Sequence, residues 1–479
     1  MYDKNELQSP FTDITMSLEA HKSYIDNYLI PEIIEKLNNE ELISYSIEHS
    51  SGLDGFMSAL YNIQLKTKTN KGEVERLLIA KFMRGDVEFR ESSKSYVQFA
   101  NEIFIYSDVL PQYEKLLNEL KITSLKISEL VPNCYKAAFG YIEGLSSSRQ
   151  SREAALVLEN LKPCGYVMGP RLILDREHLL AMCKPVAKHH AFSYALRALN
   201  NDLLERLKSG LNVLPFVAHS PEEAKGHLYT IIYRLAFDRF YDYFDRVIDT
   251  NTFDKKSPKD LKLIENLRKL REKYYAEPTK LLEKLRVQVE ETEEDRRFAA
   301  ILHGDYNRNN VLFKYQKEGE GDKVEDVKMI DFQEVRYGSP VLDLSFFMYF
   351  NSSAEGRYEL WPEMLSTYHS HMYGTLKMIL EASSKSPQEI ETILSWYSFE
   401  KFQTHFARYA FYGVLICTHF LPWMLCSEEE CSELSELFSN DFTGERFRKL
   451  SIEAGGDEVN LQILAAMRHA SEMGYMDDL

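Results

Sequence analysis

The chain has 479 residues, of which 44% are hydrophobic, and its formal net charge is −17 at pH 7. This length suits two lobes around a cleft better than a single ordinary domain. Because nucleic-acid backbones are bound by clustered Lys and Arg, so acidic a chain is a poor candidate for a nucleic-acid partner. Net negative charge of this size favours solubility instead.

The N-terminus and the cysteines predict a reduced, cytoplasmic setting. The opening MYDKNELQSPF lacks the apolar core of a secretion signal. The cysteines form no C-x-x-C pair and no Cys/His cluster of zinc spacing. They are scattered at Cys134, Cys164, Cys183, Cys417, Cys426 and Cys431.

The hydrophobic pattern divides the chain into three parts. Residues 30–42 carry Ile and Leu at helical spacing, so we expect residues 1–42 to form a helical extension packed on a small lobe. Residues 43–157 alternate strand and helix signals and predict that small lobe. Helical patterns dominate residues 158–479, with a hinge expected at about 158–164.

The small lobe contains a glycine-rich turn, SSGLDGFMS, at residues 50–58. A turn at Gly52 and Gly55 between strands could bring backbone N–H groups, with the hydroxyl of Ser58, close to phosphates. The segment is neither a Walker A motif nor a full G-x-G-x-x-G, so on its own it fits a plain hairpin turn equally well.

A lone cation, Lys81, lies inside the apolar strand-like run LLIAKFM. A buried charge is costly unless it is paired. Glu102, in a segment with helical periodicity, is the candidate partner, and such a Lys–Glu pair holds nucleotide phosphates in kinases. The alternative is that Lys81 ends its strand in solvent and that Glu102 lies on an exposed helix face.

Residues 154–161, AALVLENL, predict a strand that breaks at Lys162-Pro163. A helix is expected from Arg176 to Leu199. Within it, His189 and His190 are neighbours, and successive helical residues point about 100° apart. We therefore interpret them as packing or hydrogen-bonding residues and not as a joint catalytic site.

Residues 301–331 carry the main chemical signal. Two strand-like runs, 311–315 and 327–332, flank a Gly-rich charged loop and predict a hairpin. That hairpin would bring Asn310 and Asp331 to one end of a sheet, where their oxygens suit Mg²⁺. Asp305, in His-Gly-Asp, would accept a hydrogen bond from an attacking hydroxyl. Taken one by one, these residues also fit ordinary turns.

Residues 338–343, GSPVLD, follow the second of these strands. The Gly-Ser-Pro turn and Asp343 resemble an N-capping arrangement at a helix start. We interpret Asp343 as a structural brace first and as a metal ligand second.

The run from Tyr409 to Cys426 contains no Lys, Arg, Asp or Glu and approaches the length of a membrane span. Gly413, Thr418 and Pro422 interrupt it, and charged residues flank it on both sides. A buried core helix ending near Pro422 is the better interpretation.

The motifs HGDYNRNNVLF and MIDFQEVRYGSPVLDLSFFMY resemble the catalytic segments of the ecdysteroid kinase-like family. LVLENL and AKHHAFSYALR support the same resemblance, which spans roughly residues 43–427. The family belongs to the choline kinase and aminoglycoside phosphotransferase group and shares the protein-kinase fold. The resemblance thus implies an α+β bilobal fold, with a small antiparallel sheet and one main helix above a helical lobe that carries the catalytic hairpin.

The resemblance also assigns roles. It implies that Glu159, Asn160 and Leu161 line an adenine site and that His303 braces the catalytic loop through backbone hydrogen bonds. It supports Lys81 and Glu102 as the phosphate-holding pair.

Two departures from protein kinases point to a small-molecule substrate. Gly304 stands where an Arg often precedes the catalytic Asp, and the metal motif reads Asp-Phe-Gln instead of Asp-Phe-Gly. We therefore expect ATP- and Mg²⁺-dependent phosphorylation of a small-molecule hydroxyl, with an ecdysteroid or related alcohol as the leading acceptor class. A choline- or aminoglycoside-type kinase and a nucleotide-binding pseudokinase remain the alternatives. The oligomeric state is not predicted.

Overall fold

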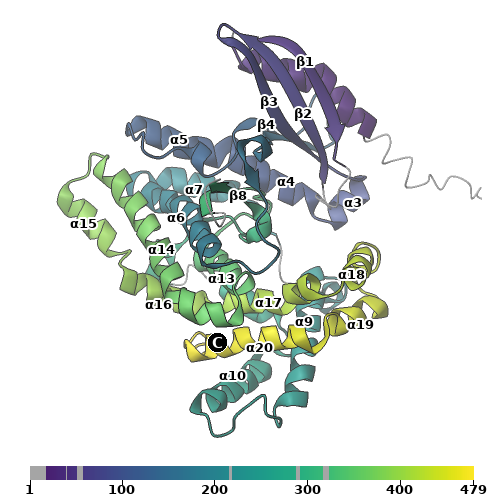
Figure 1. The fold of residues 1–479 in the computed structure, drawn as a ribbon, viewed down its shortest axis with the longest axis vertical. Coiled ribbons are helices and arrows are strands. Elements are labelled where there is room, and N and C mark those ends of the chain that lie inside the picture. Colours follow the sequence, from purple (N-terminus) through teal and green to yellow (C-terminus); the bar gives the residue numbers. More distant parts are fainter. Residues whose placement is uncertain are drawn as a thin grey trace, which may run out of the picture.

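The computed structural model describes residues 18–38, 40–50, 58–214, 218, 220–286, 292–316 and 323–479. A small lobe built on an antiparallel sheet stands above a larger, mostly helical lobe (Figure 1). The α+β, kinase-like architecture predicted from the sequence is therefore confirmed.

The sheet of the small lobe has five strands in the order β1-β2-β3-β5-β4, and each pairs antiparallel with its neighbours. The strands are β1 (Glu41–His49), β2 (Ser58–Thr69), β3 (Gly72–Met83), β4 (Cys134–Gly140) and β5 (Glu153–Glu159). Side chains alternate between the two faces of a strand. Ala80 and Phe82 therefore face one way, and Lys81 faces the other.

A leading helix covers the face that carries Ala80 and Phe82. Residues 18–24 are helical, and η1 (Ile25–Leu29) and α2 (Ile30–Lys36) continue the helix. Its buried residues pack against the sheet in one cluster, which includes Tyr24, Leu29, Ile33, Tyr61, Ile63 and Leu78. The helix expected over 30–42 ends at Lys36, because Leu42 already pairs with Thr67 as part of strand β1.

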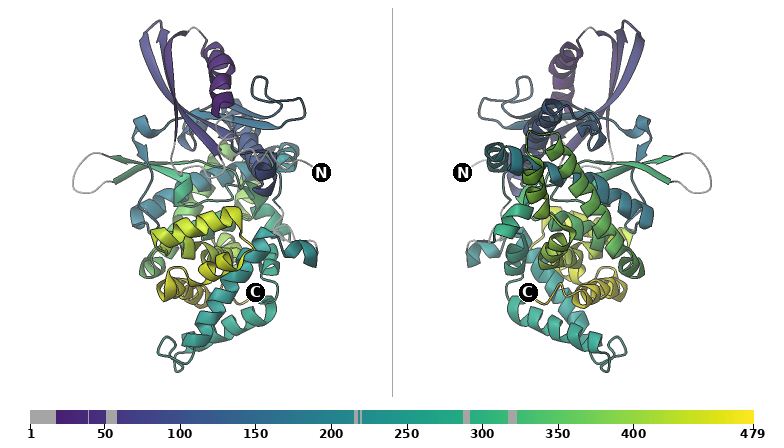
Figure 2. Two further views of the ribbon diagram at one scale, coloured as in Figure 1. Left: turned by 90° about the vertical axis from the view of Figure 1, so that its right-hand side faces the viewer. Right: turned by 90° about the vertical axis from the view of Figure 1, so that its left-hand side faces the viewer.

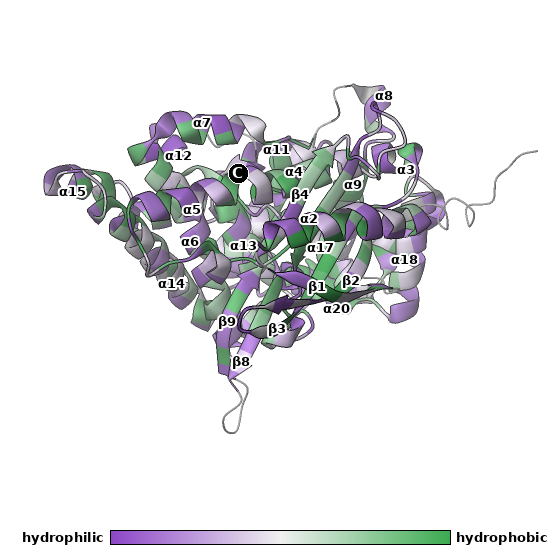
Figure 3. Cartoon of the chain, turned by 90° about the horizontal axis from the view of Figure 1, so that it is seen from above, coloured by the Kyte–Doolittle hydropathy of each residue, from purple (hydrophilic) through white to green (hydrophobic). Residues whose placement is uncertain are grey.

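The opposite face receives the main helix of the lobe. It comprises α4 (Ser95–Phe104), a π-helical turn η2 (Ile105–Val109) and α5 (Leu110–Glu119), preceded by α3 (Val87–Ser92). Phe99, Glu102 and Tyr106 are three and four residues apart and share one face of this helix. All three are buried. Outer helices such as α2 and α5 alternate hydrophilic and hydrophobic residues along their length (Figure 3).

The large lobe combines two small sheets with many helices. Its strands are β6 (Tyr166–Val167), β7 (Ala300–Leu302), β8 (Val311–Gln316), β9 (Lys323–Met329) and β10 (Arg336–Gly338). Its helices are α6 (Arg176–Leu199), α7 (Asn201–Gly210), α8 (Pro221–Ala224), α9 (Leu228–Val247), α10 (Pro258–Tyr274), α11 (Thr279–Arg286), α12 (Glu293–Phe298), α13 (Val341–Phe350), α14 (Ala354–Glu381), α15 (Pro387–Ser395), α16 (Phe399–Tyr409), α17 (Phe411–Leu425), α18 (Glu428–Asn440), α19 (Glu445–Glu453) and α20 (Gly456–Glu472). Short 3-10 turns are η3 (Ile127–Glu129), η4 (Lys162–Cys164) and η5 (Arg308–Asn310).

Helix α6 has the bounds that the sequence predicted, and it is buried along most of its length. His190 on α6 makes a 2.9 Å hydrogen bond through Nδ1 to the hydroxyl of Tyr368 on α14. The ring of His189 lies 5.9 Å from that of Tyr113 on α5. The two histidines thus point to different neighbours and pack the core, as expected from their spacing.

Within the apolar run from 409 to 426, residues 411–425 form α17, which lies in the large lobe and has its first eight residues buried. Pro422 lies inside its last turn, so the helix extends three residues beyond the predicted end. Gly413 allows α17 to approach α13 closely, since a Cβ atom there would come within 2.1 Å of the carbonyl oxygen of Ser345. Among the helices that the structure describes, none has the length and apolar character needed to cross a membrane.

Candidate active site

The hairpin formed by β8 and β9 extends from the side of the large lobe (Figure 2). Val311 pairs with Met329, so the inner ends of both strands meet at one place. There the N–H of Ile330 donates a 3.0 Å hydrogen bond to the carbonyl oxygen of Asn310. The hairpin expected from the sequence therefore forms, and it brings Asn310 next to the segment that carries Asp331.

Asp305 follows strand β7, which pairs with β10. Its Oδ2 accepts a 2.8 Å hydrogen bond from Nδ2 of Asn310, and its Oδ1 accepts a 3.0 Å bond from Nδ2 of Asn307. Burial, followed by the negative charges of Glu334 and Asp331, raises the pKa of Asp305 to about 7. A carboxyl group with a pKa near neutrality is suited to accept a proton from a hydroxyl.

Asn310 and Asp331 have the chemistry of magnesium ligands. The amide nitrogen of Asn310 is engaged with Asp305, so Oδ1 is the atom through which this side chain could hold a cation. Within the described residues, no three His, Cys, Asp or Glu side chains cluster as a metal cage. Mg²⁺ commonly binds through one or two carboxylates together with substrate phosphates and waters. Asp331 itself has a left-handed backbone, with φ of 65°.

Lys81 joins the small lobe to this site. Its Nζ lies 2.8 Å from Glu102 Oε2 and 3.3 Å from Asp331 Oδ1. The side chains of Lys81 and Glu102 are only 13% and 2% exposed, which contradicts the solvent-exposed alternative. Burial alone would lower the pKa of Lys81, but the carboxylates of Asp331 and Glu102 raise it, so Lys81 stays charged.

Asp343 braces the loop that carries Asp305. Its two oxygens accept hydrogen bonds from the backbone N–H groups of His303, at 2.7 Å, and Gly304, at 2.8 Å. His190 lies 3.1 Å from the same carboxylate. Burial would raise the pKa of Asp343, but the contacts with His190 and His303 and the bond from Gly304 hold it below its usual value.

Asp343 does not cap helix α13. The helix begins at Val341 after Pro340, and the hydroxyl of Ser339 accepts a 3.3 Å hydrogen bond from the N–H of Val341. Asp343 lies within its first turn, and its carboxylate is occupied by the N–H groups of the loop that carries Asp305. His303 adds a second brace, since its Nε2 donates a 2.9 Å hydrogen bond to the carbonyl oxygen of Ile330.

Gly304 is required by the packing of this loop. Its φ is +89°, and a Cβ atom would lie 1.8 Å from the carbonyl oxygen of Glu334. Arg336 donates through Nη2 to the carbonyl oxygen of Gly304 at 2.6 Å. The segment after Asp331 therefore leaves no room for a side chain at the position where protein kinases often carry Arg.

The expected adenine residues lie at the end of β5, where the chain passes between the lobes. The N–H of Glu159 donates to the carbonyl oxygen of Asn133, and that of Asn160 donates to Leu77, both at 2.8 Å. Leu161 is buried, and its N–H has no acceptor among the residues that the structure describes.

The glycine-rich turn expected to contact phosphates can be placed only in part. Ser58 is the first residue of β2, whereas Gly52 and Gly55 lie outside the described residues.

A cavity of about 210 Å³ opens beside Asp305 and Asp331, and its walls could not be predicted from the sequence. Helices α9, α13 and α17 supply half of the sixteen lining residues, and this half is mostly aromatic and aliphatic: Tyr229, Ile232, Tyr233, Phe346, Tyr412, Ile416, His419 and Phe420. Their helical spacing is the same as that of ordinary core residues. Asn307 was also missed, although it lies only two residues after Asp305 in the polar loop.

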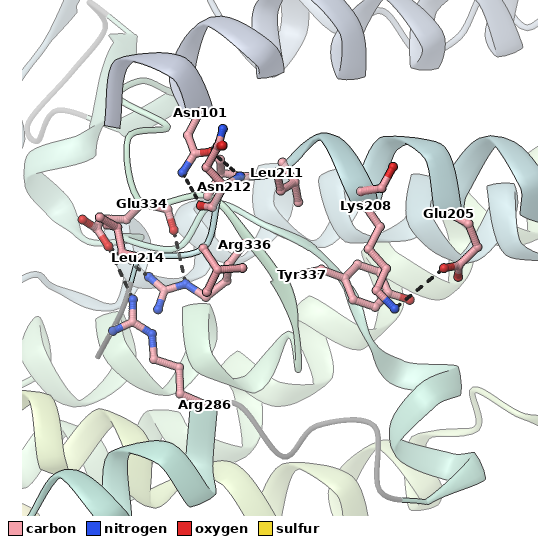
Figure 4. A pocket seen from close by; sticks show the side chains of 13 residues that line it. Asn101, Glu205, Lys208, Leu211, Asn212, Leu214, Arg286, Glu334, Arg336 and Tyr337 are labelled. Carbon is pink, nitrogen blue, oxygen red and sulfur yellow. Dashed lines mark hydrogen bonds and ion pairs between the residues drawn. The ribbon is translucent and has the colours of Figure 1, made fainter. Parts of the chain in front are cut away.

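A second cavity, of about 380 Å³, lies on the other side of an ion-pair cluster (Figure 4). Glu334 is 3.4 Å from Arg286 and 3.6 Å from Arg336, and these three residues line both cavities.

Asn101, next to Glu102 on α4, is clamped to the large lobe. It donates to the carbonyl oxygen of Asn212 at 2.9 Å and accepts from the N–H of Asn212 at 2.8 Å.

The small lobe has an antiparallel sheet and a Lys–Glu pair. The helical lobe below it places an Asp, an Asn and a second Asp around one end of a hairpin. Together these features define a kinase-like phosphotransferase architecture. The model of the ecdysteroid kinase-like family matches residues 52–381, and the chain belongs to this family. Members of the family are kinase-like phosphotransferases that act on small molecules. No curated protein sequence matches the chain.

Proposed function

We propose that this protein transfers the terminal phosphoryl group of ATP to a hydroxyl of a small, uncharged and mostly apolar alcohol. The observation that carries this proposal is the position of Asp305. Its carboxylate is hydrogen-bonded to the amide of Asn310, and together with Asp331 it lines a cavity that five aromatic side chains also line. Phosphoryl transfer needs the acceptor hydroxyl and the phosphates to meet at such a place.

The small lobe would hold the nucleotide. Lys81, fixed by Glu102, presents its ammonium group toward the site of the phosphates. Leu161 offers an N–H to adenine at the interlobe strand, and Glu159 and Asn160 shape that segment. Asn310 Oδ1 and the Asp331 carboxylate would hold Mg²⁺. When bound, the ion would neutralise charge on the phosphates.

Asp305 would orient the acceptor hydroxyl and receive its proton. Asn307 and Asn310 each donate to one of its oxygens, which fixes the plane of the carboxylate. A second lone pair on each oxygen remains for the hydroxyl. Because its pKa is about 7, the group can take up the proton near neutral pH without binding it irreversibly.

The cavity walls favour an apolar acceptor over a cationic one. Five aromatic side chains line the space beside Asp305. The carboxylates that line it outnumber Arg286 and Arg336, which pair with Glu334, by only one, so a choline-type substrate would meet little excess negative charge. Together with the family, this supports an ecdysteroid or a related hydroxylated lipid or xenobiotic as the acceptor.

A panel of acceptors, incubated with labelled ATP and Mg²⁺, tests this proposal. It would contain polyhydroxylated steroids, simple apolar alcohols, choline and an aminoglycoside. We expect phosphate ester from the steroid or apolar alcohols and none from the cations. Preferential phosphorylation of choline or the aminoglycoside would overturn the acceptor class. ATP binding without ester from any acceptor would support the pseudokinase alternative.

A further inference from the structure

Helix α17 presents a polar residue to the cavity beside Asp305. Tyr412, Ile416 and His419 are four and three residues apart, so they share one face of the helix, and all three line the cavity. Tyr412 lies within electrostatic range of Asp305. His419 lies about two turns further along, a rise of roughly 10 Å from Tyr412.

His419 differs from the other histidines around the core. His190, His303, His405 and His469 each contact a protein oxygen at hydrogen-bond distance. His419 has no hydrogen bond to any described residue, and its neighbours are the rings of Tyr233, at 5.9 Å, and Phe420, at 4.6 Å. His189 also lacks a hydrogen-bond partner in the described part of the chain, but its side chain is fully buried in the core and lines neither of the two cavities beside Glu334.

The electrical character of His419 limits what it can bind. Burial lowers its pKa to about 4, so the ring is neutral at physiological pH. The charged residues of the cavity are gathered around Asp305, in the cluster of Asp331, Glu334, Arg286 and Arg336. A neutral imidazole offers one N–H donor and one nitrogen acceptor. It therefore suits a hydroxyl or a carbonyl group better than an ion.

We propose that His419 forms a polar subsite that hydrogen-bonds a second, uncharged oxygen of the acceptor, while the hydroxyl to be phosphorylated lies at Asp305. This inference rests on the proposed function and narrows it to acceptors with two oxygen groups separated by an apolar skeleton. An otherwise unpartnered polar group on an apolar wall favours ligands that satisfy it and penalises those that do not.

The subsite is tested with androstanediol, which has a hydroxyl at each end of its ring system. Two mono-ols, each of which keeps only one of these hydroxyls, serve as comparison ligands. Dissociation constants are measured for the full chain without ATP. We expect the diol to bind about 10- to 100-fold more tightly than either mono-ol. In His419→Phe this preference is lost, whereas His419→Gln, which keeps a neutral donor and acceptor, retains part of it.

Phe420→Leu serves as the matched control, because it alters the apolar wall next to His419. It should weaken binding of the diol and the mono-ols by similar factors. Equal affinity of the wild type for diol and mono-ols, failure to bind the diol, or an unchanged preference in His419→Phe would each overturn the subsite. Phosphate transfer to the diol is measured separately. A diol that binds through His419, with no ester formed from it or from any acceptor of the panel, would leave the subsite standing and refute the phosphotransferase proposal.

Discussion

Replacing Asp305 with Asn should remove activity and, at the same time, change how stability depends on pH. The folded protein raises the pKa of this carboxyl from 3.8 to about 7, chiefly through burial. An acid with a raised folded pKa contributes full stability below its unfolded pKa and loses that contribution as pH rises through the folded value. Wild-type protein should therefore lose stability between about pH 4 and pH 7 at this site.

The size of the effect follows from the shift. One pKa unit corresponds to about 1.4 kcal/mol. The interval from pH 5 to the folded pKa covers about two units, so the wild type loses roughly 3 kcal/mol of unfolding free energy that the Asp305→Asn variant does not lose. The side-chain amide of the Asp305→Asn variant has one acceptor oxygen, so it can accept a hydrogen bond from Asn307 or from Asn310 but not from both. The lost bond lowers the unfolding free energy of the variant by about 1–2 kcal/mol at every pH.

Urea unfolding of wild type and Asp305→Asn at pH 5, 6, 7 and 8 measures this difference. The stability of the variant relative to wild type should rise by roughly 3 kcal/mol across the series. Turnover with saturating ATP should fall by about 100-fold or more. Replacement of the exposed Asp202 with Asn is the control. The difference in unfolding free energy between this variant and wild type should not change across the pH series. A stability difference for Asp305→Asn that is constant from pH 5 to 8 would refute the electrostatic reasoning.

Three further substitutions and one pH profile probe the rest of the site. Lys81→Met should raise the KM for ATP about tenfold or more, as steady-state kinetics would show, and retention of the wild-type KM would contradict its role. Gly304→Ala should cost about 3 kcal/mol or more in urea unfolding, because its Cβ meets a carbonyl oxygen. Asn101→Ala, which loses the hydrogen bonds to Asn212, should cost about 1–2 kcal/mol and weaken ATP binding, whereas an unchanged ATP affinity would show that the clamp does not act on Glu102. The pH profile of kcat/KM should rise and level off at or below about pH 7, since Asp305 must be ionised and bound Mg²⁺ would lower its pKa.

The sequence predicted most of the local chemistry because that chemistry depends on short segments. The turn after strand β7 and the β8–β9 hairpin are encoded by Gly, charge and β-prone residues within about thirty positions, so Asp305, Asn310 and Asp331 could be placed together. Lys81 was recognisable because a lone cation in an apolar strand needs a partner. Helix α6 was predicted to its residue because its pattern is long and ends at polar residues.

Contacts between distant segments could not be read in the same way. Asp343 was interpreted as a brace, but beside a helix start, because nothing local indicates that its carboxylate accepts from a loop forty residues earlier. The cavity walls from α9 and α17 carry aromatic residues at the same spacing as a buried core. The helical pattern extends over residues 37–42 because Leu42 fits its period, whereas pairing with Thr67 draws Leu42 into a strand.

Mass spectrometry of the reaction product tests the central claim most directly. Wild type and Asp305→Asn are incubated with Mg²⁺, labelled ATP and a polyhydroxylated steroid, and ATP binding is measured in parallel for both proteins. We predict a labelled steroid phosphate ester from the wild type and a yield smaller by about 100-fold or more from a variant that still binds ATP. Equal yields from both proteins, or ATP binding with no ester from the wild type, would contradict the account.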